Sequence, residues 1–505
     1  MTIYNFNHGI GWASSGVEYA QAYRSKIFRN NHQQAKFIFT DIFHENLATL
    51  TQNIGFKNHE IIWLYQFFTD IKVSSTLFDI NKLEAQFPTR PTLVEKNKQN
   101  IIYKFSDTNL RVIAYFDHSD KLSENNKIYK TEWIVGEKLI QRDYYNYVKI
   151  YSEYFKPVNN QANLYQRRFF NEDGSIAYDE LMNGEQSLFI FEDRTIYSKQ
   201  ELIVYFIERL KLTNKDILII DRSTNIGPQI IKAKGKAKVG VVIHAEHFNE
   251  LLTTSKKILW NNYYDYQFEN ARAIDFFITA THKQKTILEQ QFHKYNKGSI
   301  KVYAIPVGSI DQLKKKTRRK SHSIITASRL ASEKHLDWLI RAVVMARKEI
   351  KDLTLDIYGR GGEEGNLREL ISKLGAKEYI HLMGQHDLTN IYSKYQTYVS
   401  TSTSEGFGLT LLEAVGSGLG MIGFDVRYGS QTFIKDSQNG YLVDYIKNDV
   451  EKNISQISEA IVKMNQQEKK ELQKMREKSY EIAENFMTKK IQEQWRNLEG
   501  EVIID

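Results

Sequence analysis

The sequence predicts an α/β protein with two Rossmann-like halves, each an alternation of parallel strands and helices, and with a β-sheet domain inserted in the first half. Three observations indicate this fold. Short apolar, β-branched runs alternate with helical periodicity over residues 200–305 and again over residues 323–425. Residues 35–197 instead carry aromatic and β-branched runs between polar turns, as antiparallel sheets do. The length of 505 residues also exceeds what one hydrophobic core serves.

The first half opens with a strand predicted at residues 2–6, a glycine-containing loop and a helix over residues 17–28. The loop lacks the G-x-G-x-x-G spacing of dinucleotide-binding folds, so a nicotinamide cofactor is not indicated. After the insertion, a helix at residues 200–212 leads into buried strands; the predicted strands are residues 216–221, 239–244, 276–281 and 301–305, with a helix ending near residue 295. We assign residues 1–34 and 198–310 to the first domain.

The insertion is assigned to residues 35–197 and contains the runs IIYKF, RVIAYF, KTEWIV, NLYQRRFF and SLFIF. Residues 171–174 and the Asn183-Gly184 pair supply hairpin turns, the second typical of a type I′ turn. No cluster of catalytic residue types lies inside it. We therefore expect this sheet to hold a partner or substrate, with a stabilising appendage as the alternative interpretation.

The second half is assigned to residues 311–475 and a final helical segment to residues 476–505. Strands are predicted at residues 323–327, 353–361, 380–384, 398–403 and 420–425, with a turn at Asn439-Gly440. Helices are predicted after residue 334, after residue 367, at residues 409–415 and from about residue 450 to 498. This alternation is what a nucleotide-binding half-domain requires.

The most informative segment is SEGFGLTLLEAVGSG at residues 404–418, which follows a predicted buried strand. Gly408, Leu409 and Thr410 begin a helix, where unpaired N–H groups and the helix dipole favour an anion such as phosphate. Glu405 and Glu413 are about 12 Å apart at 1.5 Å per residue, so they are expected to contact different parts of one long ligand. The alternative is that Glu405 caps the helix and Glu413 is a surface acid.

Two further positions carry candidate ligand groups. Arg329 and Lys334 bracket a loop between a predicted strand and helix, where two cations suit a diphosphate, unless they are ordinary surface charges. His244 falls at a strand's carboxyl end, the edge where open α/β sheets bind ligands. His247 is the alternative candidate. The interpretation without a ligand is that the histidine only hydrogen-bonds to the backbone.

Composition limits the possible partners. The chain has 69 Lys and Arg against 61 Asp and Glu, a formal charge of +8, with basic runs at residues 232–238 and 314–320. These runs suit an anionic lipid surface or are solvated loops; no nucleic-acid-binding motif accompanies them. The sequence has no cysteine, no visible signal peptide and no apolar run of about 20 residues. We expect a cytoplasmic protein, with contact to the inner face of the membrane as an open possibility.

The acidic pair around Gly406, Phe407 and Gly408 resembles the signature of family 4 retaining glycosyltransferases of the GT-B fold. The run S-R-L-x-x-E-K that contains Arg329 and Lys334 matches the same family closely. The resemblance implies two Rossmann-like domains facing a cleft, with the last helix crossing back to the first. It also implies that Glu405 contacts the transferred sugar, that Glu413 contacts the ribose and that the histidine faces the donor sugar.

The resemblance extends to other donor contacts. In the family, a glycine loop closes over the donor's phosphates and sugar, and Gly16 is the candidate for that loop here. The alternative is that Gly16 only begins a helix. The IHLMGQHD segment around Gly384 resembles the loop that contacts the base. The chain departs from the family at Gly418-Leu419-Gly420, where Gly-Leu-Pro is usual, and this puts the entry into the next strand in doubt. The expected catalytic residues are Glu405, His244, Arg329 and Lys334, and the expected donor-binding residues are Gly16, Arg329, Lys334, Tyr358, Gly384, Glu405, Gly406, Phe407, Gly408, Leu409 and Glu413.

Along nearly the whole chain, GIGWASSGVEYAQAYRSKI, VVIHAEHF, LWNNYYDYQF and TSTSEGFGLTLLEAVGSG resemble the GtfA family of accessory-Sec glycosyltransferase subunits. The resemblance implies transfer of N-acetylglucosamine from UDP to Ser and Thr of a serine-rich repeat adhesin. It also implies a hetero-oligomer with a paralogous GtfB-type companion, of which a heterotetramer is one arrangement. No cofactor and no metal are expected. UDP-glucose as donor, a non-catalytic companion subunit and a polysaccharide synthase are the alternatives.

Overall fold

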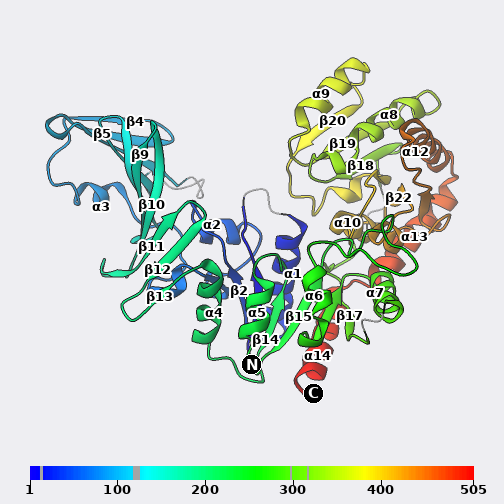
Figure 1. The fold of residues 1–505 in the computed structure, drawn as a ribbon. Helices are drawn as coiled ribbons and strands as arrows, with labels where there is room; N and C mark the ends of the chain where they lie inside the picture. Colours follow the sequence, from blue (N-terminus) through cyan, green and yellow to red (C-terminus); the bar gives the residue numbers. More distant parts are fainter. Residues whose placement is uncertain (12–14, 118–125, 296–297, 316–317, 505) are drawn as a thin grey trace. The chain divides into compact units, whose positions relative to one another are not determined.

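The computed structural model describes residues 1–11, 15–117, 126–295, 298–315 and 318–504 (Figure 1). It confirms an α/β fold built on three sheets of seven, ten and six strands. By its internal contacts the chain divides into two compact units. The first comprises Met1–Val241 and Arg272–Asp275, and the second Val242–Ala271 and Phe276–Asp505.

The seven-stranded sheet has the order β17-β16-β15-β14-β1-β2-β3. Its pairs β1–β2, β2–β3, β1–β14, β14–β15 and β16–β17 are parallel. The chain enters at β1 and reverses its direction of travel across the sheet between β1 and β14, as doubly wound folds do. The strands are β1 (Ile3–Asn7), β2 (Ala35–Phe39), β3 (Ile61–Trp63), β14 (Ile217–Ile220), β15 (Lys238–Ile243), β16 (Phe276–Thr279) and β17 (Val302–Ala304).

The predicted start of the inserted sheet at residue 35 is wrong, because β2 and β3 belong to this parallel sheet. Phe37, Ile38 and Phe39 are consecutive and all buried, so both faces of β2 are covered. That is the environment of a central parallel strand, whereas a strand with one solvated face alternates. The antiparallel sheet begins at Leu93 and ends at Ile196.

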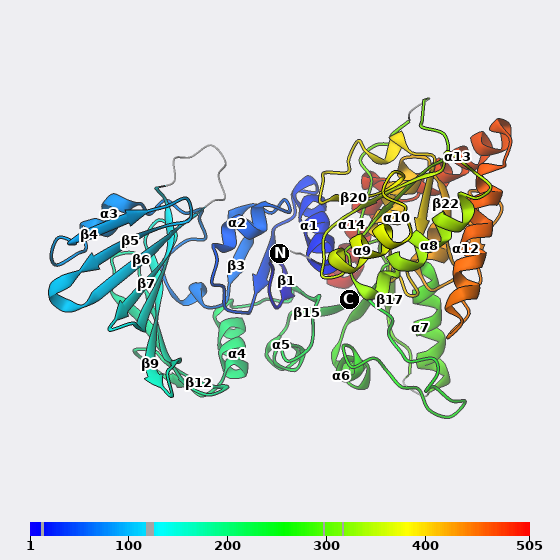
Figure 2. The ribbon, with the colours of Figure 1, turned by 90° about the horizontal axis from the view of Figure 1, so that it is seen from above.

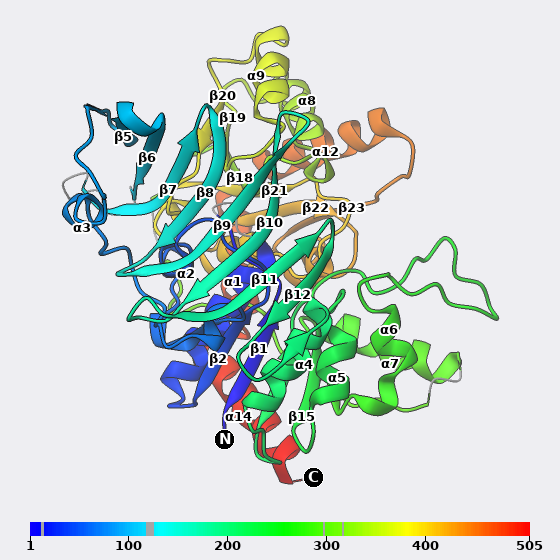
Figure 3. The same ribbon diagram turned by 60° about the vertical axis from the view of Figure 1, so that its left-hand side comes forward.

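The ten-stranded sheet is a meander in which every strand pairs with its neighbour in sequence (Figure 3). The hairpin predicted at Asn183-Gly184 is confirmed, since it joins two antiparallel strands. Tyr151 and Tyr178 on this sheet are buried and donate hydrogen bonds to the carbonyls of Phe43 and Tyr65, which anchors the sheet to the parallel part of the first unit. The strands are β4 (Leu93–Lys96), β5 (Asn100–Phe105), β6 (Leu110–Phe116), β7 (Ile128–Val135), β8 (Lys138–Tyr145), β9 (Lys149–Val158), β10 (Gln161–Phe170), β11 (Ile176–Asn183), β12 (Gln186–Ile190) and β13 (Thr195–Ile196).

The six-stranded sheet lies wholly in the second unit, and all its pairs are parallel in the order β20-β19-β18-β21-β22-β23. Neighbouring residues of one strand enter different cores: Ile324 packs on one face and Ile325 on the other. The predicted strands at residues 323–327 and 380–384 are confirmed. The strands are β18 (Ser323–Ala327), β19 (Thr354–Tyr358), β20 (Ile380–Gly384), β21 (Thr397–Ser400), β22 (Gly420–Phe424) and β23 (Gly440–Val443).

Helices cover both faces of this sheet, and α8 and α12 pack against each other (Figure 2). Within the second unit, Tyr303 of β17 donates a hydrogen bond to Glu501 of α14. The helices are α1 (Gly16–Asn30), α2 (Leu47–Gln52), α3 (Ile80–Glu84), α4 (Lys199–Arg209), α5 (Gly227–Ala233), α6 (Asp265–Glu269), α7 (His282–Lys294), α8 (Leu336–Ala346), α9 (Glu364–Lys373), α10 (Leu409–Gly416), α11 (Gly429–Phe433), α12 (Val450–Asn465), α13 (Lys469–Glu484) and α14 (Thr488–Ile504).

Candidate active site

The strand order of the six-stranded sheet reverses between β18 and β21. Open α/β sheets bind ligands at such a switch point, beyond the carboxyl ends of the strands. The segment after β18 carries Arg329 and Lys334, and the segment after β21 leads through Glu405 into α10. The topology therefore brings the two predicted motifs to one edge of one sheet.

The structure joins the two motifs by an ion pair. Nζ of Lys334 donates to Oε2 of Glu405 at 2.9 Å, and the two side chains are 18% and 20% exposed. The Thr401 hydroxyl at the end of β21 donates to the Lys334 and His335 carbonyls, which holds the lysine beside β21. A charge-assisted pair of this kind fixes the orientation of both side chains, and each side chain remains partly exposed. The alternative that Glu405 caps α10 does not hold, because the cap residue is Gly408.

Two glycines give this segment its shape. A Cβ on Gly406 would lie 2.4 Å from the His244 carbonyl oxygen, so no larger residue fits there. Gly408 has φ +87°, in the left-handed region that favours glycine. Between them Phe407 is buried against Phe433 and Phe486, and this fixes the loop to the core of the second unit.

The N-terminus of α10 has the form of an anion site. No described side chain caps it. Its first N–H groups are therefore available, and the helix dipole is positive at this end. Thr410 in its first turn hydrogen-bonds to the buried Tyr398 hydroxyl at 2.8 Å, while Leu409 packs within van der Waals reach of Gly308.

Glu413 lies further along α10, where Oε2 accepts a hydrogen bond from the Tyr392 hydroxyl at 2.9 Å. It is half-buried and bonded, not a free surface acid. Tyr358 is buried at the end of β19, and its hydroxyl lies 3.0 Å from that of Tyr395. Gly384 ends β20 with φ +73°. The structure thus places Glu413, Tyr358 and Gly384 in the second unit with the Lys334–Glu405 pair.

Arg329 differs from Lys334. Its guanidinium is 58% exposed and pairs with Glu333 at 2.9 Å, four residues along the chain. The loop thus leaves this side chain in solvent, as an ordinary surface charge would be, and its role as a diphosphate ligand stays a prediction.

The two candidate histidines have different environments. His247 is 0% exposed, and its ring nitrogens lie 2.8 Å from Gln291 Oε1 and 3.1 Å from the Tyr428 hydroxyl. Burial lowers the pKa of His247 to about 4, so the ring is neutral near pH 7. His244 is half-buried, and its backbone N–H donates to the Tyr264 hydroxyl. Of the two candidates, His244 is therefore the more exposed, and its contact with the donor sugar stays a prediction.

The buried His247 makes the protein's stability depend on pH. Its pKa is about 4 when folded against an ordinary 6.5, so the unfolded chain binds more protons between these values. The free energy of unfolding should fall by about 3 kcal/mol as the pH drops from 6.5 to 4, and change little from this group above 6.5. Chemical denaturation at a series of pH values checks this. His247→Gln should flatten that slope, and an unchanged slope would contradict the prediction.

Gly16 lies in the first unit, as the first residue of α1. Ser15 and Glu18 form a capping box around it, and a Cβ on Gly16 would meet nothing within 4 Å. The surrounding protein therefore does not require glycine here, and its role as a donor contact stays a prediction. Residues 12–14 of the same loop lie outside the described residues.

The Gly-Leu-Gly departure leaves the strand entry regular. β22 begins at Gly420, and the N–H of this residue donates to the Gln396 carbonyl, a hydrogen bond that proline lacks.

The basic runs are partly engaged within the protein. Lys234 pairs with Asp275, and Arg319 donates to the carbonyls of Tyr395 and Ser417. Residues 316–317 of the second run lie outside the described residues.

Three residues near the candidate site segment, Glu246, Arg427 and Tyr428, were not predicted from the sequence. The main chain of Arg427 and Tyr428 hydrogen-bonds to Glu405. Tyr428 donates to Oε1 of Glu246 at 2.6 Å, and Arg427 pairs with Glu250 at 2.6 Å. Both sets follow the carboxyl ends of parallel strands, β15 and β22, and that position was the available signal.

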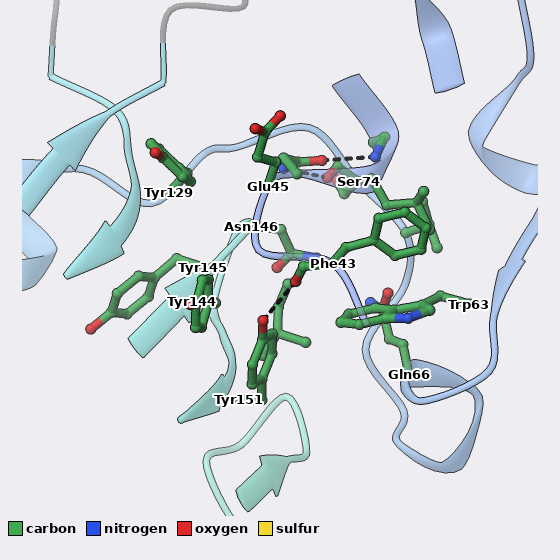
Figure 4. A pocket seen from close by; sticks show the side chains of 15 residues that line it. Phe43, Glu45, Trp63, Gln66, Ser74, Tyr129, Tyr144, Tyr145, Asn146 and Tyr151 are labelled. Atoms are coloured by element: carbon green, nitrogen blue, oxygen red, sulfur yellow. Dashed lines mark hydrogen bonds between the residues drawn. The ribbon is translucent and has the colours of Figure 1, made fainter. Parts of the chain in front are cut away.

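A pocket that opens to solvent lies elsewhere, in the first unit (Figure 4). It is lined by Phe43, Trp63 and neighbouring residues on one side and by Tyr144, Tyr145 and Tyr151 of the antiparallel sheet on the other. Tyr151 donates to the Phe43 carbonyl. No predicted site residue lines it, so we interpret this pocket as the seam between the two sheets of the first unit.

Within the described part of the chain, no three His, Cys, Asp or Glu side chains are grouped so as to hold a metal ion. Among the same residues, no helix has the length and apolar character needed to cross a membrane.

Two family models match the chain. The model described as "GtfA extended beta-sheet domain" matches residues 93–193, and the one described as "Glycosyl transferases group 1" matches residues 309–482. These ranges correspond to the antiparallel sheet and to most of the second unit. Together with the switch-point site they define a glycosyltransferase of the GT-B fold.

The relatives make the assignment narrower. The UDP-N-acetylglucosamine–peptide N-acetylglucosaminyltransferase GtfA subunit of Streptococcus gordonii is 50% identical, over 99% of this chain and 99% of the relative. The subunit of the same name from Streptococcus agalactiae is 50% identical, over 98% and 97%. This chain therefore belongs to the GtfA family of glycosyltransferases.

Solved structures agree. The crystal structure of the pneumococcal O-GlcNAc transferase GtfA in complex with UDP and GlcNAc has a TM-score of 0.95 at 47% identity, covering 100% of this chain and 99% of that one. The crystal structure of a GtfA/B complex gives 0.93 at 49% identity, covering 100% of both chains. TarM of Staphylococcus aureus, at 20% identity and a TM-score of 0.74, shares the fold.

Proposed function

We propose that this chain transfers N-acetylglucosamine from UDP-N-acetylglucosamine to serine and threonine hydroxyls of a protein, with retention of the anomeric configuration. The observation that carries the proposal is the Lys334–Glu405 pair beside the uncapped N-terminus of α10, at the switch point of the sheet. The names of the relatives, at 50% identity over nearly the full chain, support the donor and the peptide acceptor.

The charged groups of the site have different proposed roles. The positive end of α10 and the Lys334 ammonium stabilise the negative charge that develops on the departing diphosphate. The exposed Arg329 guanidinium is free to turn from Glu333 toward an added phosphate, at little cost because a surface ion pair is weak. Glu405, fixed by Lys334, orients the sugar hydroxyls. The leaving phosphate accepts the proton of the acceptor hydroxyl on the same face of the sugar.

The remaining candidates suit the nucleoside. Glu413 is held by Tyr392 and offers carboxylate oxygens to the ribose hydroxyls. Gly384 and Tyr358, at the carboxyl ends of β20 and β19, are our candidates for the region of the base.

Mass spectrometry of a Ser-rich polypeptide, incubated with this chain, its companion subunit and each UDP-sugar in turn, tests the proposal. We expect N-acetylhexosamine on Ser or Thr with UDP-N-acetylglucosamine only. Hexose from UDP-glucose would instead support the alternative donor. An unmodified acceptor with both donors would contradict the proposed transfer.

We also propose a GtfB-type companion, a serine-rich repeat adhesin as acceptor, and a cytoplasmic location, in which contact with the inner face of the membrane is optional. The companion is supported by the solved GtfA/B complex, whose chain is 49% identical to this one. The adhesin and accessory-Sec assignments rest on the family resemblance of the sequence, and the membrane contact rests on the basic runs at residues 232–238 and 314–320.

The antiparallel sheet is the proposed companion-binding element. Its edge strand β4 is exposed along its whole length, including Leu93 and Val94, and an apolar open edge favours pairing. Deleting the sheet would expose buried aromatics such as Tyr151, so point variants are the better test. Leu93→Asp with Val94→Asp should abolish co-purification with the companion and leave UDP affinity unchanged. Undiminished co-purification would place the interface elsewhere.

Transfer should persist in excess EDTA, because Lys334, Arg329 and the helix end supply the positive charge that a metal ion supplies in other transferases. Initial rates with and without chelator check this. Abolition by EDTA and recovery with Mg²⁺ or Mn²⁺ would show that these groups are not sufficient.

A further inference from the structure

Next to the main chain of Glu405 lies a partly buried hydrogen-bonded network in the second unit. Tyr428 is 0% exposed, and its hydroxyl donates to Oε1 of Glu246 at 2.6 Å. The same hydroxyl lies 3.1 Å from Nδ1 of His247, whose Nε2 lies 2.8 Å from Gln291 Oε1. Arg427 lies 3.8 Å from the other Glu246 oxygen. The Tyr428 hydroxyl therefore joins the segment after β22 to the segment after β15.

These two segments hold the main chain of the site loop from two sides. The N–H groups of Tyr428 and Gly429 donate to the Glu405 carbonyl at 2.7 and 2.8 Å, and the Glu405 N–H donates to the Arg427 carbonyl at 3.2 Å. On the other side, the His244 carbonyl lies so close to Gly406 that a Cβ there would be 2.4 Å from its oxygen.

We infer that Tyr428, through Glu246, is a positioning residue for Glu405 that fixes the distance between the two segments holding the catalytic loop. This inference rests on the proposed role of Glu405 in sugar transfer. Glu246 pairs with a buried phenol at short distance, and hydrogen bonds to charged groups are the stronger ones. Without the phenolic O–H, Glu246 loses its buried hydrogen-bond donor. The two segments are then joined by the more exposed Arg427–Glu250 pair and the longer Arg427–Glu246 contact, which fix their separation less precisely. Misplacing a catalytic group by about 1 Å costs about 100-fold in rate.

Removing the Tyr428 hydroxyl should change kcat and not the affinity for UDP. Neither Tyr428 nor Glu246 belongs to the anion site at α10, which Lys334 and the helix end form in the same unit. Tyr428→Phe should therefore lower kcat for transfer by about 10- to 100-fold, and change the affinity for UDP by less than about 2-fold.

Four further variants, compared with Tyr428→Phe, test the inference in full-length protein with its companion. Glu246→Ala should match the kcat loss of Tyr428→Phe, and the double variant should lose no more than either single change, because both remove one interaction. Glu246→Gln should stay within about 3-fold of wild type, since its amide oxygen still accepts the phenolic hydrogen bond. Tyr441→Phe is the matched control: this tyrosine of the same unit is also buried, and its hydroxyl accepts from Gln467.

The readouts are kcat, the KM for the donor, UDP affinity by calorimetry and the melting temperature. A kcat for Tyr428→Phe equal to that of Tyr441→Phe would overturn the inference. So would parallel losses of UDP affinity and melting temperature, which indicate a general packing role. If Tyr428→Phe does not fold, the difference in kcat between Glu246→Ala and Glu246→Gln tests the inference instead. Both of these variants are expected to fold, because the Glu246 side chain is partly exposed. Wild-type protein that transfers no sugar refutes the proposed function itself, whereas active wild type with indifferent variants refutes only the positioning role.

Discussion

Glu405→Gln should reduce transfer by about 100- to 1,000-fold while the protein folds normally. The amide is nearly isosteric but uncharged, so Lys334 loses its charged partner at 2.9 Å and the sugar loses an oriented carboxylate. Stability should change by less than about 1 kcal/mol, because the pair is partly exposed and surface ion pairs contribute little. The loop itself is held by main-chain hydrogen bonds to residues 427–429, which the change leaves intact.

Initial transfer rates and melting temperatures, measured on the same preparations, check this result. Glu364→Gln is the control, since Glu364 is an acid in an exposed ion pair with Arg368 on α9. It should transfer sugar at the wild-type rate. Wild-type turnover of Glu405→Gln would remove this residue from the reaction.

Lys334→Ala should weaken UDP binding by about 2–3 kcal/mol and lower transfer further, because it removes a charge-assisted contact and leaves Glu405 without its partner. Arg329→Ala should have a smaller effect on UDP binding, about 1.5 kcal/mol, because its guanidinium is 58% exposed and must be ordered when the ligand binds. Its stability should match wild type, since the Arg329–Glu333 pair is a surface pair.

Calorimetric titration with UDP measures the affinity of the Lys334 and Arg329 variants. Lys334→Arg is the matched control, because it retains the positive charge and should recover part of the affinity. UDP affinities that are unchanged in both alanine variants would place the diphosphate site elsewhere in the protein.

Several strands and helices of the second half could be predicted because their apolar residues follow local patterns. The strands at residues 323–327 and 380–384 are apolar runs bounded by polar residues and glycine, and both are confirmed to the residue. The helix at Leu409 follows from its apolar spacing. The association of Glu405 with Lys334 was also inferable, because residues that follow adjacent parallel strands meet at one edge of a sheet.

The start of the antiparallel sheet could not be read in the same way. AKFIF at residues 35–39 is compatible with either kind of strand, and only its pairing with β1 assigns it to the parallel sheet. Pairing depends on residues far apart in the sequence, which a local pattern does not encode.

The sequence by itself determined the fold class, the family resemblance and the chemical character of the site, since these depend on residue types at short spacing. The tertiary structure decided which histidine is accessible, that Arg329 is solvent-exposed and that Tyr428 meets Glu246 across 182 positions of sequence. Burial and long-range hydrogen bonds arise only when distant segments pack, because access to water and the choice of partner are properties of the assembled core.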